Sequence, residues 1–307
     1  MALSNNIAIF KQLGKSTFLT GLDALRPASA LPLDDAAIAD ADFLNQLFTD
    51  YGVDGYQALG NISAASLTDI QSISSNCNNR VISLQYDEAN TASSQEHPPT
   101  MFLKMPVKSL TTRVFFNVIM SWQLECEFYK KLAHRLPVRT PKPYVMGYKN
   151  SRFIMLMEDL HADPSVVLHT NIEMLKGPGL GTVKRCLTTL ARLHSAFHGI
   201  EKTEQEALLP QRLQPFMAQT MRAITPLMGR AALANVLKSG DIVLTKKQQD
   251  TYLTAIKHWD ELVDHWAQGP LTLVHGDSHL GNFLVSGDEM GMLDFQAVHW
   301  GKGIRCA

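Results

Sequence analysis

The residues best suited to chemistry lie near the end of the chain, in residues 271–300. An apolar run ends at His275, a polar loop follows with Asp277 and Asn282, and a second turn leads to Asp294. Carboxylate and amide oxygens are the hard donors that Mg²⁺ prefers, and a carboxylate can also orient and deprotonate a hydroxyl group. Any one of these residues would be ordinary in a turn. Together they predict a site for phosphoryl transfer.

The spacing of these residues makes the prediction more specific. Asp277 precedes Asn282 by five residues, as Asp precedes Asn in the catalytic loop H-R-D-x-x-x-x-N of protein kinases. Asp294 stands in Leu-Asp-Phe-Gln, where that pattern has Asp-Phe-Gly. Phosphoryl transfer needs a carboxylate that deprotonates the acceptor and oxygen ligands that hold Mg²⁺ against the nucleotide phosphates. We predict Asp277 and Asn282 as catalytic residues, and Asn282 with Asp294 as the metal ligands.

The string HGDSHLGNF followed by LDFQ resembles the loop H-G-D-x-H-x-x-N of the aminoglycoside phosphotransferase and choline kinase superfamily. The continuation VHWGKGIR is most similar to the ecdysteroid-kinase-like branch of that superfamily, and the likeness covers about residues 67–305. It implies an α+β, protein-kinase-like fold of two lobes, a small antiparallel sheet lobe and a mainly helical lobe. It also implies ATP as the donor, with GTP as the alternative, Mg²⁺ as the metal and a small-molecule hydroxyl as the acceptor.

The superfamily normally continues after GKGIR with an Asp and several helices that close the acceptor site. This chain stops at Ala307, so we expect its helical lobe to be incomplete at the end. Weak or absent activity is therefore an alternative to a fully active kinase.

A kinase-like site needs a lysine on the third strand and a glutamate on the following helix. Lys104 stands in the strand-like run Met-Phe-Leu-Lys-Met, and the next helix offers Glu125 and Glu127. At about 100° per residue, Glu125 lies on the apolar face and Glu127 lies nearly opposite. The residues that define this face are Val118, Trp122, Phe128, Tyr129, Leu132 and Leu136. Because a carboxylate on such a face needs a cation, we predict that Glu125 pairs with Lys104 and that both serve the nucleotide; another local cation is the alternative.

Two further segments are candidates for nucleotide contacts. Residues 155–160 (MLMEDL) resemble the hinge between kinase lobes, where backbone groups of Met157 and Asp159 would bind the adenine edge. An ordinary buried strand end is the alternative. The phosphate-covering loop is expected at residues 72–79 (SISSNCNN), which contain no glycine, and a plain hairpin turn is the alternative there.

Three histidines near these motifs have different expected roles. His275 begins the catalytic loop and is predicted to organise it. His279, between Asp277 and Asn282, is expected either to contact phosphate or to support the loop. His194 shares a helical face with apolar residues and is predicted to be a core histidine.

The remaining pattern predicts the elements that position the site. Helices are predicted over 34–51, 112–136, 180–198, 212–239 and 246–267, and strands over 67–86 (two, around a turn at 74–79), 101–105, 144–148, 152–158, 271–274, 283–285 and 290–293. We divide the chain into a loosely ordered leader (1–36), an N-terminal nucleotide-binding lobe (37–159) and a helical C-terminal lobe with the catalytic and metal-binding loops (160–307).

Composition limits the class of protein. A hydrophobic fraction of 45% and a charged fraction of 19% are ordinary for a globular chain, and a net charge of −1 gives no basic surface for nucleic acid. Four scattered cysteines without metal-ligand spacing favour a reducing, cytoplasmic location. The apolar runs are far shorter than the roughly 20 residues that span a bilayer, so no membrane is expected as a partner. The acceptor and the oligomeric state stay open.

Other classes of protein remain as alternatives. An inert, nucleotide-binding pseudokinase would share the same motifs. A metal-dependent hydrolase is a second alternative, because His275, Asp277 and His279 have a spacing that Zn²⁺ ligands can have. A protein kinase is a weaker one, because the chain has no Ala-Pro-Glu-like anchor.

Overall fold

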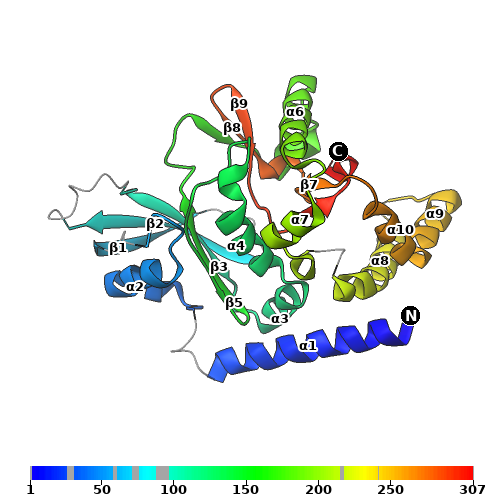
Figure 1. Cartoon of the computed structure of the whole chain (residues 1–307), viewed down its shortest axis with the longest axis horizontal. Coiled ribbons are helices and arrows are strands. Elements are labelled where there is room, and N and C mark those ends of the chain that lie inside the picture. The colour runs from blue at the N-terminus through cyan, green and yellow to red at the C-terminus, as the bar shows by residue number, and fades with distance from the viewer. Residues whose placement is uncertain are drawn as a thin grey trace.

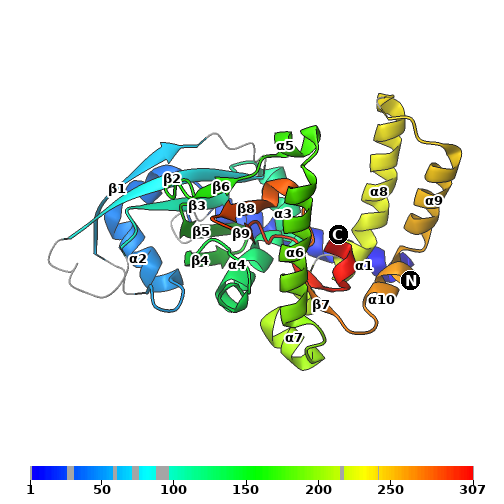
Figure 2. The same ribbon diagram turned by 90° about the horizontal axis from the view of Figure 1, so that it is seen from above.

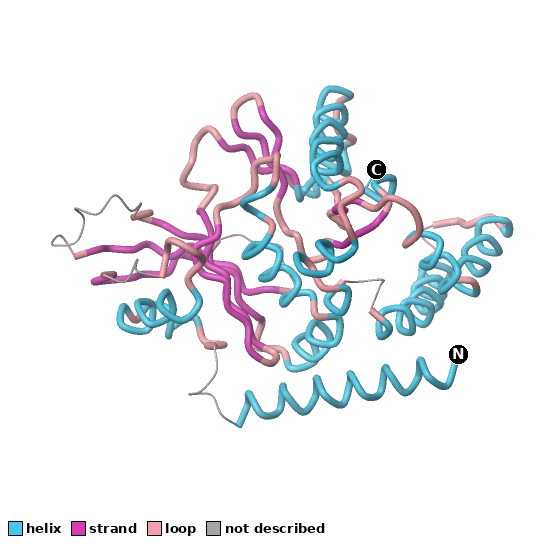
Figure 3. Tube along the Cα trace, viewed as in Figure 1, coloured by secondary structure: helices cyan, strands magenta, loops and turns pink. Residues whose placement is uncertain are grey.

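The structure is a computed structural model that describes residues 2–25, 31–57, 61–70, 76–87, 97–214, 218–240 and 242–306. Most strands lie together at one side of the molecule, and helices α8 (Gln219–Ser239), α9 (Lys246–Lys257) and α10 (Trp259–Trp266) lie at the opposite side (Figures 1 and 3). Seen from above, α6 (Leu180–Phe197) and α7 (Lys202–Leu208) stand between the sheet and α8–α10 (Figure 2). The α+β fold class, with a small antiparallel sheet lobe and a mainly helical lobe, is confirmed.

Five antiparallel strands form the main sheet in the order β1-β2-β3-β5-β4. They are β1 (Ile62–Asp69), β2 (Cys77–Tyr86), β3 (Thr100–Pro106), β4 (Pro143–Lys149) and β5 (Arg152–Glu158). Alternate residues of the apolar strand β5 enter two different cores. Phe153 and Met155 pack with the cluster that contains α4 (Ser121–Lys131), whereas Ile154 and Leu156 pack with α2 (Ala41–Tyr51). Both faces of the sheet are therefore covered, which explains why this strand reads as a continuous apolar run.

The prediction of a single helix over residues 112–136 is wrong, because the chain forms two helices there. The chain forms α3 (Leu110–Ile119) and then α4, with a short 3₁₀ turn (Ala133–Arg135) after them. Met120 separates the two helices in the left-handed region, at φ 55°. The break turns α4 so that the rings of Phe116 and Trp122 stack, with centroids 5.2 Å apart. Helical periodicity identified the apolar positions, but it carries no information on a change of axis between two helices that share one core.

Helices form most of the second lobe. They are α5 (Asn171–Lys176), α6 (Leu180–Phe197), α7 (Lys202–Leu208), α8 (Gln219–Ser239), α9 (Lys246–Lys257) and α10 (Trp259–Trp266). The second lobe also contains two small sheets, with the strand orders β6-β8-β9 and β7-β10. Their strands are β6 (Val166–Leu168), β7 (Thr272–Val274), β8 (Phe283–Ser286), β9 (Glu289–Met292) and β10 (His299–Gly301). In the described part of the chain, no helix combines the length and the apolar character needed to cross a bilayer.

The expectation of a loosely ordered leader is corrected by the structure. Residues Ala2–Leu25 form helix α1, which runs along one side of the molecule against α3 and α8 (Figure 1). The Ser16 hydroxyl donates to the Val114 carbonyl oxygen at 2.8 Å and accepts from the Asn117 amide at 3.2 Å. These polar contacts lie where α1 meets α3, and they were not visible in a segment of mixed composition.

A buried charge cluster fixes the end of α1. Asp23 is 2% exposed, and its carboxylate accepts hydrogen bonds from the Ser151 amide and hydroxyl and from the Asn150 side chain. The guanidinium groups of Arg113 and Arg152 lie 4.0 and 3.9 Å from the same carboxylate. The pKa of each arginine is lowered, first of all by burial. One carboxylate thus compensates two buried cations, so the attachment of α1 depends on its charge.

We expect Asp23→Asn to lower the free energy of unfolding by about 3 kcal/mol, because two buried guanidinium groups would lose their anion. Urea unfolding followed by circular dichroism measures this loss. Asp288→Asn, which removes the same charge from an exposed turn, is the matched control and should cost less than about 0.5 kcal/mol. Equal losses for the two variants would contradict the role assigned to Asp23.

His299 is the first residue of β10, and two hydrogen-bond partners outside this strand fix its protonation state. Its Nδ1 lies 2.9 Å from the Ala297 carbonyl oxygen, which can only accept, so Nδ1 carries the proton. Its Nε2 accepts from the Arg305 guanidinium at 2.9 Å. Burial, followed by the charge of Arg305, lowers the pKa of His299 to about 4. The folded protein therefore holds this histidine neutral.

Acidification should destabilise the protein through His299. Between pH 6.5 and about 4, the unfolded chain binds a proton that the folded state refuses, so stability falls as pH falls through this window. From about pH 7.5 to about pH 5 we expect this group to remove about 2 kcal/mol of unfolding free energy. Urea unfolding of wild type and His299→Gln at both pH values measures it. A loss on acidification that is the same in both proteins would contradict the assignment.

Candidate active site

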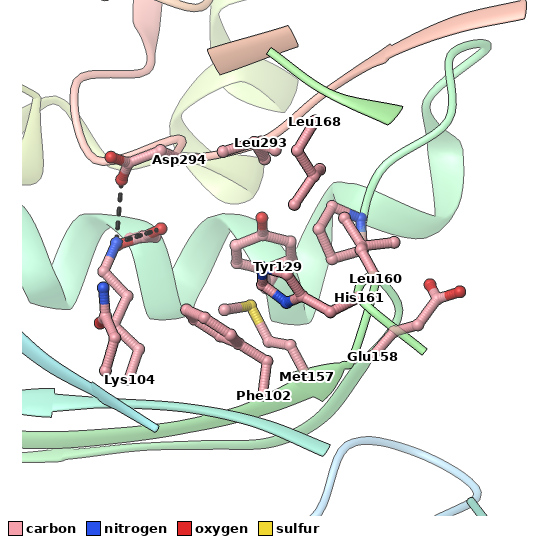
Figure 4. Close-up of a pocket in the computed structure, with 13 residues that line it drawn as sticks. Phe102, Lys104, Tyr129, Met157, Glu158, Leu160, His161, Leu168, Leu293 and Asp294 are labelled. Carbon is pink, nitrogen blue, oxygen red and sulfur yellow. Dashed lines mark hydrogen bonds and ion pairs between the residues drawn. The ribbon is translucent and has the colours of Figure 1, made fainter. Parts of the chain in front are cut away.

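The centre of the candidate site is the ammonium group of Lys104, on β3. Its Nζ donates to Glu125 Oε1 at 3.0 Å and Oε2 at 2.7 Å, and to Asp294 Oδ1 at 2.9 Å. The predicted pair between β3 and the following helix is therefore present, and Glu125, rather than Glu127, makes it. Glu125 is 1% exposed on α4, whereas Glu127 bonds Lys131 and the Tyr148 hydroxyl. Figure 4 shows Lys104 reaching toward Asp294.

Electrostatics keep Lys104 and Asp294 ionised within this cluster. Burial acts to lower the pKa of Lys104, but Asp294 and Glu125 together raise it well above its ordinary value. Burial acts to raise the pKa of Asp294, but the charge and hydrogen bond of Lys104 hold it below the usual range. Burial raises the pKa of Glu125 to about 7, against the opposing effect of Lys104. Asp294 is thus the carboxylate best kept as an anion.

The catalytic loop follows β7 and is held by its own side chains. The Asn282 side-chain NH₂ donates to the Asp277 carbonyl oxygen at 2.8 Å, which leaves Asn282 Oδ1 as an acceptor. The backbone N–H of Leu293 donates to the Asn282 carbonyl oxygen at 3.0 Å, so Asn282 lies beside the strand end that carries Asp294. Gly276 has φ 85°, and a Cβ atom there would collide with the Ala297 carbonyl. This explains the glycine between His275 and Asp277.

His275 organises the loop, as its position predicts. Its Nδ1 accepts from the Asp277 backbone N–H at 3.3 Å, and its Nε2 donates to the Leu293 carbonyl oxygen at 2.9 Å. Both ring nitrogens are used by the protein, and the side chain is fully buried. His275 is therefore not available as a ligand in the Zn²⁺ set of the hydrolase alternative. Among the described residues, no group of three or more His, Cys, Asp or Glu side chains is arranged to hold a metal ion.

The backbone of Asp294 has an unusual conformation, and the side chain of the next residue, Phe295, is buried. Asp294 adopts φ 62°, in the left-handed region that Asp and Asn tolerate better than other side chains with a Cβ. Phe295 is fully buried and stacks on Phe128 of α4, with ring centroids 4.0 Å apart. The His275 ring packs on Phe295 at 4.6 Å. The aromatic core therefore fixes the backbone that presents the Asp294 carboxylate to Lys104.

A pocket opens between these residues and the sheet (Figure 4). Its cavity volume is about 180 Å³, which is smaller than the roughly 300–1,000 Å³ of typical small-molecule sites. One end is polar, with Lys104, Glu125 and Asp294. The rest of the lining is largely apolar and includes Phe102, Tyr129, Pro141, Met157, Leu160, Leu168 and Leu293. A charged end joined to an apolar slot suits a nucleotide, whose phosphates and base need these two environments.

The oxygen donors fit a magnesium ion at the polar end. Asp294 supplies an ionised carboxylate, and Asn282 supplies an amide oxygen that makes no hydrogen bond to the described residues. Both are hard donors of the kind that Mg²⁺ selects.

The two residues of the hinge prediction lie in different surroundings, and their backbone contact with adenine stays a prediction. The Met157 side chain lines the pocket, but Met157 also pairs with Phe102 of β3 in the sheet. The Asp159 carbonyl oxygen accepts from the Ala162 N–H at 3.1 Å, so it is used in a turn. The Asp159 carboxylate instead accepts from the His161 backbone N–H at 3.1 Å and contacts the His161 ring at 3.2 Å.

Several lining residues were missed from sequence. Phe102 and His161 lie in the pocket with ring planes 23° apart, and no motif indicated either. The signal available for His161 was its place directly after the hinge-like segment. Of the expected phosphate loop, residues 72–75 lie outside the described part of the chain. Residues 77–79 belong to strand β2, where Asn79 lines the pocket opposite Lys104.

We expect the three charges of the Lys104 cluster to be strongly coupled. Lys104→Met should cost about 3 kcal/mol of unfolding free energy, because two buried carboxylates would face each other. Glu125→Gln should cost about 1 kcal/mol, since Lys104 keeps Asp294 as its partner. The double variant should cost less than the sum of the two single losses by about 1 kcal/mol or more.

Urea unfolding of the four proteins measures this coupling. Glu127→Gln, on the same helix but outside the pocket, is the matched control and should lose less than about 1 kcal/mol. Additive losses in the double variant would show that the pair contributes nothing beyond its separate residues.

The chain is similar to known proteins in sequence and in structure. The model of the phosphotransferase enzyme family matches residues 119–302, which is more than half of the chain. A sequence comparison with curated proteins found no significant match.

Three solved structures are similar to this chain at low identity. A mutant of aminoglycoside 2′-phosphotransferase-IIIa in complex with GDP has 13% identity and a TM-score of 0.44, covering 86% of this chain and 74% of that one. A streptomycin–ATP complex of APH(2″)-IIa has 15% identity and a TM-score of 0.41, covering 90% and 74%. Choline kinase from Cryptosporidium parvum Iowa II has 15% identity and a TM-score of 0.46, covering 86% and 66%.

At these identities and TM-scores the structural likeness assigns no function to this chain. The ecdysteroid-kinase-like branch stays a prediction. The family model spans α4, residues 155–160, the loop with Asp277 and Asn282, and Asp294, whereas Lys104 on β3 lies before the matched range. The chain therefore belongs to the phosphotransferase enzyme family.

Proposed function

We propose that this protein transfers the γ-phosphoryl group of ATP to a hydroxyl group of a small molecule. The observation that carries the proposal is the position of Lys104, bonded at once to Glu125 at 2.7 Å and to Asp294 at 2.9 Å inside a pocket with an apolar end. A lysine held by a glutamate beside a metal-binding aspartate is the arrangement that phosphoryl transfer requires.

Lys104 and Glu125 divide the work of holding the phosphates. Lys104 keeps its positive charge at every physiological pH, because the two carboxylates raise its pKa. Glu125 fixes the direction of the ammonium group from the helix side. When a nucleotide enters, Lys104 can exchange its bond to Asp294 for a phosphate oxygen while it keeps its bond to Glu125. The lysine then binds phosphate without leaving a buried charge unpaired.

Asp294 and Asn282 are the residues that would hold Mg²⁺. A bound Mg²⁺ would neutralise charge on the β- and γ-phosphate oxygens and align the transferred group. The left-handed backbone at Asp294, supported by the buried Phe295 ring, directs the carboxylate to the polar end of the pocket. The hydrogen bond from Asn282 to the Asp277 carbonyl oxygen sets the direction of its Oδ1.

Asp277 is the residue assigned to the acceptor. Its side chain is 41% exposed, so a small molecule can reach it from solvent. His275 and Asn282 fix the Asp277 backbone on both sides, through its N–H and its carbonyl oxygen. The carboxylate would orient the acceptor hydroxyl and accept its proton as the new P–O bond forms.

Nucleotide binding tests the metal assignment. We expect Mg²⁺ to strengthen ATP binding by about tenfold or more, and Asp294→Asn to remove that gain while leaving Mg²⁺-free binding within about threefold. Isothermal titration calorimetry with and without Mg²⁺ measures both. Asn is chosen because it tolerates the left-handed backbone. Asp288→Asn, an exposed site in the same lobe, is the control and should keep the full Mg²⁺ effect.

Turnover tests the role of Asp277. We expect Asp277→Asn to lower the rate of ADP formation, with water or a hydroxylated acceptor, by about 100-fold or more, because the proton acceptor is lost. Its affinity for ATP with Mg²⁺ should stay within about threefold of wild type. Absence of ATP binding by the folded wild-type protein would overturn the proposed function. Tight binding with no measurable turnover would favour the pseudokinase alternative.

A further inference from the structure

The polar groups of the pocket are unevenly divided between its two ends. Lys104 and Asp294 occupy the end assigned to the phosphates (Figure 4), and Glu125 joins them there through its bonds to Lys104. At the other end, Glu158 is engaged by the protein itself. Its carboxylate binds the Arg139 guanidinium, at 2.8 Å for one of the two bonds, and accepts from the Lys142 N–H at 3.1 Å. In Figure 4 the Glu158 carboxylate points away from the pocket.

The hinge backbone at this end is also largely used by the fold. The Glu158 N–H donates to the Lys142 carbonyl oxygen at 2.8 Å, and the Asp159 carbonyl oxygen accepts from Ala162. Met157 is paired with Phe102 within the sheet. A nucleotide base has polar edge atoms that need partners when buried. Side chains that line this end can therefore supply part of the recognition beside the remaining backbone groups.

His161 is the side chain placed to do this. It lines the pocket, and its ring projects between Tyr129 and Met157 (Figure 4). Its Nδ1 lies 3.2 Å from the Asp159 carboxylate, whose side chain is only 6% exposed. An ionised carboxylate can only accept, so Nδ1 carries the proton and Nε2 of the neutral ring is an acceptor. The Tyr129 hydroxyl, the other polar group nearby, points across the pocket toward Leu293 (Figure 4).

The orientation of the ring also suits a planar ligand. The planes of His161 and Phe102 are 23° apart, with centroids 6.5 Å from each other. A base that lies in the plane of the imidazole is then nearly parallel to the Phe102 ring. It can donate an in-plane hydrogen bond from its edge to His161 and stack on Phe102 with its face, since the two contacts do not compete.

We propose that His161, oriented by Asp159, selects adenine over guanine in the donor nucleotide. This inference rests on the proposed function. The 6-amino group of adenine donates to a neutral imidazole Nε2, whereas the 6-oxo group of guanine presents a lone pair to it. Asp159 is the positioning residue, because its carboxylate decides which ring nitrogen carries the proton. The two residues thus define the donor as ATP rather than GTP through a side-chain contact beyond the hinge backbone.

Competition between bases tests the proposal. Dissociation constants for ATP, GTP and inorganic tripolyphosphate, each with Mg²⁺, are measured by calorimetry on the full chain. Wild type should bind ATP about tenfold or more tightly than GTP. His161→Ala should bring the two nucleotides within about threefold of each other, through weaker ATP binding. Asp159→Asn should also reduce the preference, because an Asn amide can donate to Nδ1 and move the proton to Nε2.

Controls separate base recognition from damage to the site. Tripolyphosphate carries no base, so its affinity should stay within about threefold in all variants. His265→Ala, an exposed histidine outside the pocket, should keep the preference for ATP. If wild type binds ATP and GTP equally, or if His161→Ala keeps the preference, the assignment of His161 is wrong and the proposed function stands. If neither nucleotide nor tripolyphosphate binds to the folded protein, both proposals are overturned.

Discussion

The structure depends on one buried ammonium group that must be neutralised. Lys104 Nζ has two carboxylate partners, one 21 residues and one 190 residues away in the chain. A buried cation without them would be strongly destabilising, so strand β3, helix α4 and the segment after β9 must converge on one point. The same requirement joins the sheet lobe to the loops of the helical lobe. The proposed site for phosphate and metal therefore coincides with a charge cluster that the fold already needs.

The aromatic core supports this cluster from behind. Phe295 follows Asp294 directly and is stacked on Phe128 of α4, which also carries Glu125. The His275 ring packs on Phe295, and its nitrogens hold the backbones of Asp277 and Leu293. A shift of α4 would move both the Glu125 carboxylate and the surface on which Phe295 rests. Position of the charges and packing of the core are thus linked through one helix.

Polar groups in this protein divide into those used by the fold and those left for a ligand. Asp23, Glu158 and His299 have their hydrogen bonds within the protein, and they fix α1, the hinge and β10. Asn282 and Asp277 are held in place through the Asn282 side-chain NH₂ and the Asp277 backbone, which leaves Asn282 Oδ1 and the Asp277 carboxylate for a ligand in the proposed function. His161 belongs to the second group in the proposed site for the base, because Asp159 contacts only its Nδ1.

The sequence by itself determined the strand that carries Lys104 and the choice of Glu125 over Glu127, whereas the chemistry that it predicts for the loop with Asp277 and Asn282 stays a prediction. These follow from residue type, spacing and helical direction, which are local properties of the chain. Tertiary structure alone decided that Asp294 bonds to Lys104, that the helix breaks at Met120, that α1 is held by Asp23, and that His161 enters the pocket. The physical reason is that local patterns specify which side chains are buried. Which distant partners those side chains meet depends on how helices and sheet pack around a shared core and on where buried charges find their counterions.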